Sequence, residues 1–211
     1  MYKGYEVAYR LACEELRNVH DVEELCLRSG ATCRRQDDRI TIAVPYVGRV
    51  HRVTLPAVEV SLEGSEEDVS LVDRILILHY LLQAKGTPLS NTLIGYVELP
   101  GGNSYLPTFA KRAIRPLVAH FGDRPERLPE VAVGLGGRPR DYGDASVTID
   151  AFPRVPITFV VWRGDEEFPP EGNILFDGTV SDYLTTDDIN ALCGVIVGRL
   201  IRLSRAADSK V

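Results

Sequence analysis

The spacing of hydrophobic positions changes from helical to alternating within the first 63 residues. Apolar residues recur at helical spacing through residues 2–18, and a second short helical segment follows Asp21, which is suited to cap it. Beyond Gly30 apolar positions alternate with polar ones, the pattern of strands with one wet face. The alternating segments are residues 31–36, 39–44, 48–55 and 58–62. This part of the chain therefore predicts two helices followed by an antiparallel meander.

A buried central helix is predicted over about residues 66–85. Ser65 and Asp68 form a capping box at its start, and Gly86 follows its end. Between Ile75 and Leu82 the sequence is apolar nearly all round. A helix of this kind is buried on most of its sides, so we expect it to form the centre of the core.

The remaining sequence mixes helices and strands without a regular repeat. A helix over about 106–121 contains Pro116, which we expect to kink or divide it. Strands are predicted at 147–151 and 157–162. Thr185 starts a C-terminal helix over about 186–204, whose arginines Arg199, Arg202 and Arg205 complement the helix dipole.

This order of elements predicts an α+β fold, in which antiparallel sheets pack against several helices. We expect one domain over residues 1–211. Within it, residues 1–63 hold the N-terminal helices and the meander, and residues 64–211 hold the core helix and the sequence motifs.

Composition and net charge limit the binding partners and the cellular compartment that we expect for this protein. The net charge of −6 disfavours general nucleic-acid binding, because an acidic protein repels phosphate backbones. No run of apolar residues reaches the length of a membrane span, and the first residues do not resemble a signal peptide. We therefore expect a cytoplasmic protein that binds neither nucleic acid nor a membrane.

The four cysteines do not predict a metal centre. Cys13, Cys26, Cys33 and Cys193 include no CxxC pair and no close Cys/His set. A zinc site or an iron–sulfur cluster held by this chain alone is therefore poorly supported.

His79 is the first candidate for a ligand-binding residue, because it lies in the middle of the apolar core helix. Burial lowers a histidine pKa, and a neutral imidazole is a good ligand for a metal or for the iron of a tetrapyrrole. Tyr80, Tyr105 and Trp162 are aromatic residues suited to line such a pocket. The alternative is a core histidine bonded to a carbonyl or carboxylate. His51, on a half-exposed strand, is a weaker candidate.

A glycine pair suggests an anion site. Gly101 and Gly102 precede a predicted helix, so backbone amides there are open to an anion, and Arg112 follows one or two turns later. The alternative is a tight turn without a ligand.

An acidic loop suggests a metal site. Asp165, Glu166 and Glu167 follow a predicted strand, and Asp177 follows another. Clustered carboxylates bind hard cations or supply an acid or base. The alternative is a solvated turn whose acids cap neighbouring amides.

The order of motifs resembles an uncharacterised family, domain of unknown function 3786. The resemblance rests on three groups of residues: 78–81 with 98–102, then 105–122, and finally 143–177, which include Asp-Glu-Glu-Phe-Pro and Leu-Phe-Asp. It implies an anaerobic context and similarity to longer proteins that carry a four-cysteine iron–sulfur module of the kind found beside corrinoid proteins. This chain has no such module, so an iron–sulfur role needs a partner.

The leading hypothesis is a ligand-binding or accessory protein of anaerobic metabolism. Its cofactor would be a tetrapyrrole such as haem or a corrinoid, and its protein partner an iron–sulfur or corrinoid protein. One alternative is an enzyme that uses the carboxylates with a divalent metal. The other is a protein–protein interaction module.

Overall fold

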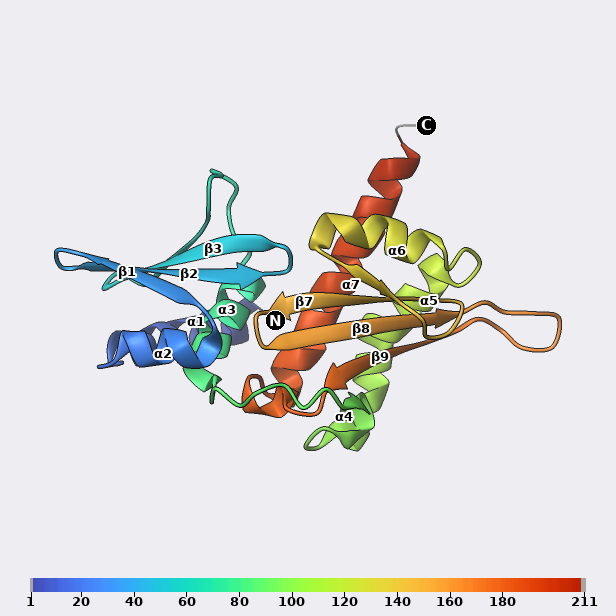
Figure 1. Cartoon of the computed structure of the whole chain (residues 1–211), viewed down its shortest axis with the longest axis horizontal. Coiled ribbons are helices and arrows are strands. Elements are labelled where there is room, and N and C mark those ends of the chain that lie inside the picture. The colour runs from blue at the N-terminus through green and yellow to red at the C-terminus, as the bar shows by residue number, and fades with distance from the viewer. Residues whose placement is uncertain (1, 210–211) are drawn as a thin grey trace.

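The computed structural model describes residues 2–209, with side chains from residue 4 onward. Two antiparallel sheets lie side by side, and helices fill the space around them (Figure 1). The C-terminal helix α7 (Thr186–Asp208) packs against α3 (Leu71–Gln83) of the first half and against helices of the second. The predicted α+β class is thus confirmed.

The first half of the chain follows the sequence pattern closely. Asp21 caps α2 by accepting the amide of Glu24 at 2.8 Å, and Gly30 ends that helix with a φ of 71°. The strands then form a meander in the order β1-β2-β3-β4. The bounds are α1 (Tyr2–Arg17), α2 (Val22–Ser29), β1 (Thr32–Gln36), β2 (Arg39–Tyr46), β3 (Arg49–Leu55) and β4 (Glu59–Leu62).

The core helix α3 begins at Leu71, five residues later than the prediction. Ser70 is its N-cap, because the Ser70 hydroxyl accepts the amide of Asp73 at 3.2 Å. The Ser65 hydroxyl accepts the amide of Glu67 at 3.1 Å, so it closes a local turn instead of capping the helix. The apolar centre of α3 is buried as expected, with Leu76, Ile77 and Leu78 at 1% exposure or less.

The second half contains a five-stranded sheet of order β5-β9-β8-β7-β6. Its central strands β7 and β8 are buried along almost their whole length. The strand bounds are β5 (Leu93–Gly95), β6 (Arg138–Arg140), β7 (Ala145–Phe152), β8 (Val155–Trp162) and β9 (Glu171–Asp177). The other elements are α6 (Arg127–Ala132) and the 3₁₀ turns η1 (Tyr96–Glu98), η3 (Val133–Leu135) and η4 (Val180–Asp182).

The helix expected over 106–121 starts earlier and contains a π turn. It consists of α4 (Gly102–Phe109), the π turn η2 (Ala110–Ile114) and α5 (Arg115–Phe121). Pro116 has no N–H, and its ring would clash with the carbonyl of Arg112 in a regular α-helix. The wider turn lies just before this proline, so the interruption predicted from Pro116 is present. The same turn contains Arg112.

The two halves share one core. Phe152 at the end of β7 stacks on Tyr80 of α3 with 4.0 Å between ring centroids, and it lies 4.8 Å from the Tyr46 ring. The amide of Val47 donates to the carbonyl of Ala151 at 3.0 Å. Buried apolar residues from both halves form a single cluster.

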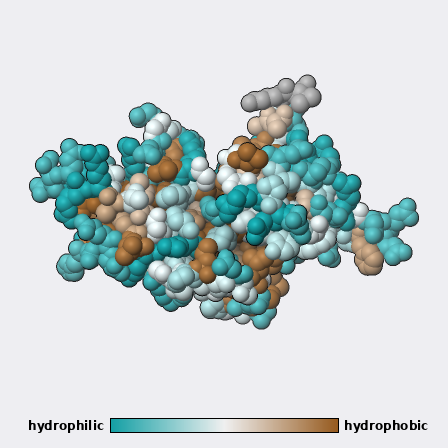
Figure 2. Space-filling view, viewed as in Figure 1, coloured by the Kyte–Doolittle hydropathy of each residue, from teal (hydrophilic) through white to brown (hydrophobic). Residues whose placement is uncertain are grey.

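Hydrophilic side chains cover most of the face seen in Figure 2, with small hydrophobic patches between them. Among the described residues, no helix combines the length and the hydropathy that crossing a membrane requires.

Candidate functional site

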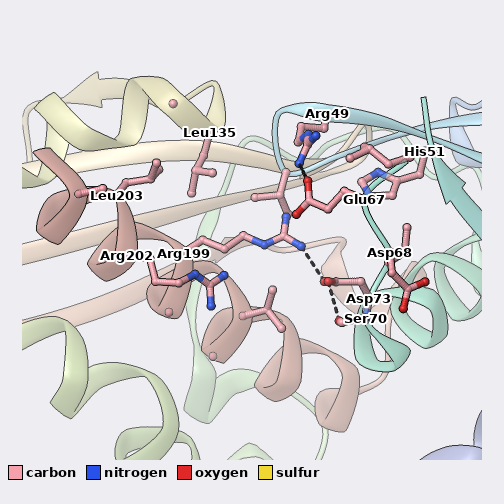
Figure 3. A pocket seen from close by; sticks show the side chains of 18 residues that line it. Arg49, His51, Glu67, Asp68, Ser70, Asp73, Leu135, Arg199, Arg202 and Leu203 are labelled. Atoms are coloured by element: carbon pink, nitrogen blue, oxygen red, sulfur yellow. Dashed lines mark hydrogen bonds and ion pairs between the residues drawn. The ribbon is translucent and has the colours of Figure 1, made fainter. Parts of the chain in front are cut away.

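One cavity, here called the central pocket, lies where the first sheet, the start of α3 and one face of α7 meet (Figure 3). Its volume of about 660 Å³ falls within the range of small-molecule sites. The lining residues are Val47, Arg49, His51, Leu62, Glu67, Asp68, Val69, Ser70, Asp73, Gly134, Leu135, Gly194, Val195, Gly198, Arg199, Arg202, Leu203 and Ala206.

A buried carboxylate organises one wall of the central pocket. Asp73 accepts hydrogen bonds from the hydroxyls of Tyr46 and Ser70, both at 2.7 Å. Arg199 reaches across from α7 to Asp73 and forms an ion pair of 2.8 Å, as Figure 3 shows. Because both charged side chains are largely buried, this pair fixes the position of the Arg199 guanidinium.

Tyr46 supports the same guanidinium from a second direction. The Arg199 guanidinium carbon lies 5.2 Å from the centroid of the Tyr46 ring, within the range of a cation–π contact. Burial and the negative charge of Asp73 raise the pKa of Tyr46 well above its ordinary value. Tyr46 is therefore a neutral hydroxyl donor.

His51 lines the central pocket with an unused polar atom. The residue is 4% exposed, and its Nδ1 has no hydrogen-bond partner among the residues that the structure describes. Burial and the positive charge of Arg199 lower the pKa of His51, so its ring is neutral near pH 7. The Nδ1 atom itself is shielded from solvent, so His51 contributes a neutral and largely buried ring to the wall of the central pocket.

The charges at the mouth of the central pocket leave one arginine unpaired. Arg49 pairs with Glu67 at 2.9 Å, and Asp68 pairs with Arg74. Arg202 has no ion pair within residues 4–209. The lining thus holds three arginines and three acidic residues, and Arg202 is the arginine without an acidic partner among the described residues.

Sequence reasoning missed the central pocket. It treated His51 as a weak candidate and Arg199 and Arg202 as residues that complement the helix dipole. A local signal existed in α7, where Gly194 and Gly198 share a helix face beside these arginines. A Cβ added at Gly198 would meet no atom within 4 Å, so the missing side chain leaves space on that face.

His79 lies at a second cavity, here called the side pocket, of about 300 Å³. Its Nδ1 lies 2.7 Å from Oδ1 of Asp188, which forms the capping box of α7 with the N-cap residue Thr185. This hydrogen bond raises the pKa of His79, although burial opposes the shift. The lining residues are Tyr5, Ala8, Val72, Ile75, Leu76, His79, Arg112, Asp187, Asp188 and Ala191.

Arg112 lines the same side pocket as His79, although 33 residues separate them in the sequence. The π turn η2 presents Arg112 to α7, where Gly194 leaves room for its stem. A Cβ at Gly194 would lie 2.7 Å from Cγ of Arg112. The structure thus brings together two of the predicted ligand-binding residues.

The three aromatic residues that were predicted to line a ligand pocket do not line the side pocket with His79 and Arg112. Tyr80 is fully buried, and its hydroxyl donates to the carbonyl of Ser29 and accepts the amide of Arg154. Tyr105 lines a separate shallow pocket beside Thr186. Trp162 is 40% exposed at the end of β8. These three side chains therefore do not line one cavity with His79.

Gly101 and Gly102 form a tight turn against the backbone. Gly101 has a φ of 73°, and a Cβ at Gly102 would lie 2.0 Å from the carbonyl oxygen of Tyr96. The pair thus allows α4 to start directly against η1. Arg112 lines the pocket with His79 and lines no cavity with these glycines.

The four predicted metal-ligating carboxylates do not gather. Asp165 lies in the exposed β8–β9 loop and accepts the amides of Glu167 and Phe168, while Glu166 is also exposed. Asp177 is buried and accepts five hydrogen bonds from Ser90, Asn91 and Thr179. Within the described part of the chain, no three His, Cys, Asp or Glu side chains lie together as a metal site requires.

Asp177 instead anchors the loop before β5. Burial by itself would raise the pKa of Asp177, but the hydrogen bonds from Thr179 and Ser90 outweigh it and lower the pKa. A carboxylate with this many donors is held as a structural anion.

Searches of curated proteins and of solved structures found no match. A family model does match, over residues 21–199, which include the core helix, both sheets and most of α7. The chain therefore belongs to the family described as Domain of unknown function (DUF3786).

Proposed function

We propose that this protein binds a small organic anion in the central pocket. The observation that carries the proposal is the pair of guanidinium groups that line this pocket: Arg199, which Asp73 and Tyr46 hold in place, and Arg202, which has no acidic partner among the described residues.

The electrostatics of the central pocket favour a negative ligand. Arg199 is held in place by Asp73 and Tyr46, and Arg202 keeps its charge without an acidic partner in the described residues. Fixed guanidinium groups recognise carboxylates and phosphates through paired hydrogen bonds. The N-terminus of α3, capped by Ser70 at the pocket wall, adds a favourable dipole.

The other residues of the central pocket wall suit an apolar part of the ligand. Leu62, Val69 and Leu135 line it together with Leu203, and glycines leave space between them. A ligand with one anionic group and a small apolar part would therefore use both kinds of surface.

Inorganic phosphate is a simple probe for this site. We expect calorimetric titration to detect phosphate binding that Arg202→Ala weakens by about tenfold. Arg205→Ala is the matched control, because Arg205 is exposed on the same helix and does not line the pocket. No binding, or equal losses in both variants, would contradict the proposal.

A tetrapyrrole ligand at His79 is the second candidate, together with the accessory role in anaerobic metabolism. One observation favours it: the hydrogen bond from His79 to Asp188, since iron-ligating and zinc-ligating histidines commonly donate their second N–H to a carboxylate. The dispersal of Tyr80, Tyr105 and Trp162 weighs against it. The third reading, a protein–protein interaction module, stays a prediction, because the geometry of these two pockets does not test it.

Anaerobic purification distinguishes the two candidates. A Soret-type or corrinoid absorption band that His79→Ala removes would favour the tetrapyrrole. A colourless protein that releases a small acid on denaturation, identified by mass spectrometry, would favour the central pocket. Loss of that acid in Arg202→Ala but not in His79→Ala would assign it to the central pocket.

A further inference from the structure

We infer that the side pocket at His79 is a second ligand site, for a small α-amino acid with an apolar side chain. Its charged residues are not those of the central pocket, because no charged residue lines both cavities. The inference therefore goes beyond the proposed anion site and does not depend on it.

The first element of the site is a histidine with a fixed tautomer. Asp188 is held by the hydroxyl of Thr185 at 2.6 Å and by the Gln83 side-chain amide at 3.3 Å. A carboxylate only accepts hydrogen bonds, so the proton of neutral His79 lies on Nδ1, which faces Asp188 at 2.7 Å. Nε2 makes no hydrogen bond within the described residues; it donates while the imidazole is protonated and accepts only above the raised pKa of His79.

The second element is an arginine without an acidic partner. Arg112 forms neither an ion pair nor a side-chain hydrogen bond within the described residues, although it lines the side pocket. It is placed there by a π turn, a feature that is frequent at functional sites. Gly194 leaves room for its stem, because a Cβ there would collide with Cγ of Arg112. Its guanidinium is thus available to bind a carboxylate bidentately.

The charges of the side pocket select a zwitterion over a simple anion. Asp187 is exposed on the pocket wall and carries a negative charge opposite in sign to Arg112. An ammonium group next to a carboxylate would donate to Asp187, while the carboxylate meets Arg112. An anion alone would be repelled by Asp187 and Asp188.

The apolar surface of the side pocket accounts for the side chain of the ligand. Ala8, Val72, Ile75 and Ala191 line it between the polar groups. A neighbouring cavity of about 280 Å³ shares Tyr5, Val72, Arg112 and Ala191 with it, so there is space beyond the polar groups. A branched aliphatic side chain matches this surface.

L-valine and its two truncated analogues test the inference. 3-Methylbutanoate lacks the amine, and 2-methylpropylamine lacks the carboxylate. We expect saturable binding of valine by calorimetry, with each analogue weaker by about tenfold or more. We also expect valine to shift the ring NMR signals of His79. Absence of saturable valine binding, or equal binding of 3-methylbutanoate, would overturn the inference.

Matched variants assign the site. Arg112→Ala is expected to weaken valine binding by about tenfold, whereas Arg115→Ala, an exposed arginine of the same helical stretch, should leave it unchanged. Both positions are exposed, so neither substitution should disturb the core. Far-UV circular dichroism is the check that each variant is folded. Valine binding that persists in Arg112→Ala would overturn the inference. Valine binding that is unchanged in Arg202→Ala shows that the two sites are independent.

Discussion

Asp73 and Arg199 form an ion pair of 2.8 Å that joins α3 to α7 beside the central pocket. Their side chains are 11% and 17% exposed, so water screens the pair only weakly. Asp73 also accepts hydrogen bonds from two hydroxyl groups, which leaves the carboxylate well satisfied. The same residues thus stabilise the junction of the two halves and hold a guanidinium at the pocket.

Replacing Asp73 by alanine should destabilise the protein strongly. The change leaves the Arg199 charge and the Tyr46 hydroxyl buried without their partner, and such losses cost about 3–5 kcal/mol. Urea unfolding measures the difference. Asp150→Ala is the control, because it removes the exposed pair with Arg138 and should cost about 1 kcal/mol or less. Similar losses in the two variants would contradict a special role for Asp73.

Replacing His51 should affect the free energy of unfolding differently from replacing its neighbour Tyr46. Because its Nδ1 has no partner in the described structure, His51→Leu should leave the free energy of unfolding unchanged or raise it by about 1 kcal/mol. Tyr46→Phe removes a hydrogen bond to a charged group and should lower it by about 1.5–3 kcal/mol.

The functional part of this prediction concerns phosphate binding, which should fall in Arg202→Ala and persist in His51→Leu, because the Nδ1 atom of His51 is shielded from the pocket. Thermal unfolding and calorimetric titration on the same samples check both parts. A strongly destabilised His51→Leu variant would show that the imidazole has a structural partner, and loss of phosphate binding in that variant would contradict this prediction.

Local patterns were sufficient to predict most elements of the fold. The caps at Asp21 and Thr185, the meander and the apolar core of α3 each depend on residues a few positions apart. The start of α3 was wrong because Ser65 and Ser70 both precede suitable acidic residues, and only packing selects Ser70. The π turn was predicted only as a kink at Pro116.

The sites depend on contacts that no local pattern contains. Asp177 accepts hydrogen bonds from Ser90 and Asn91, which lie 87 and 86 residues earlier in the sequence. Its carboxylate suggested a metal ligand, but in the fold it anchors the loop before β5. His79 and Arg112 were both selected by residue type, but Arg112 was assigned to the wrong neighbours. Arg199 and Asp73 come from helices more than a hundred residues apart, so their pairing required the structure.

The pair of His79 and Asp188 should make stability depend on pH in a defined window. The hydrogen bond to Asp188 raises the pKa of His79 above its ordinary value of 6.5. Burial by itself would raise the pKa of Asp188, but the hydrogen bonds from His79 and Thr185 lower it below 3.8. His79 therefore adds stability that is complete below pH 6.5 and is lost as the pH rises through its raised pKa. Asp188 adds stability that is present above pH 3.8 and is lost as the pH falls through its lowered pKa.

The variant His79→Gln isolates the charge of this pair, because the glutamine amide can still donate to Asp188. The difference in free energy of unfolding between the natural protein and this variant should be on the order of 1 kcal/mol near pH 5. It should shrink as the pH rises above about 6.5 and through the raised pKa of His79, where the imidazole loses its proton in the native state. Urea unfolding at several pH values measures it. A difference that stays constant or grows with pH would mean that His79 is neutral in the native state and acts only through packing.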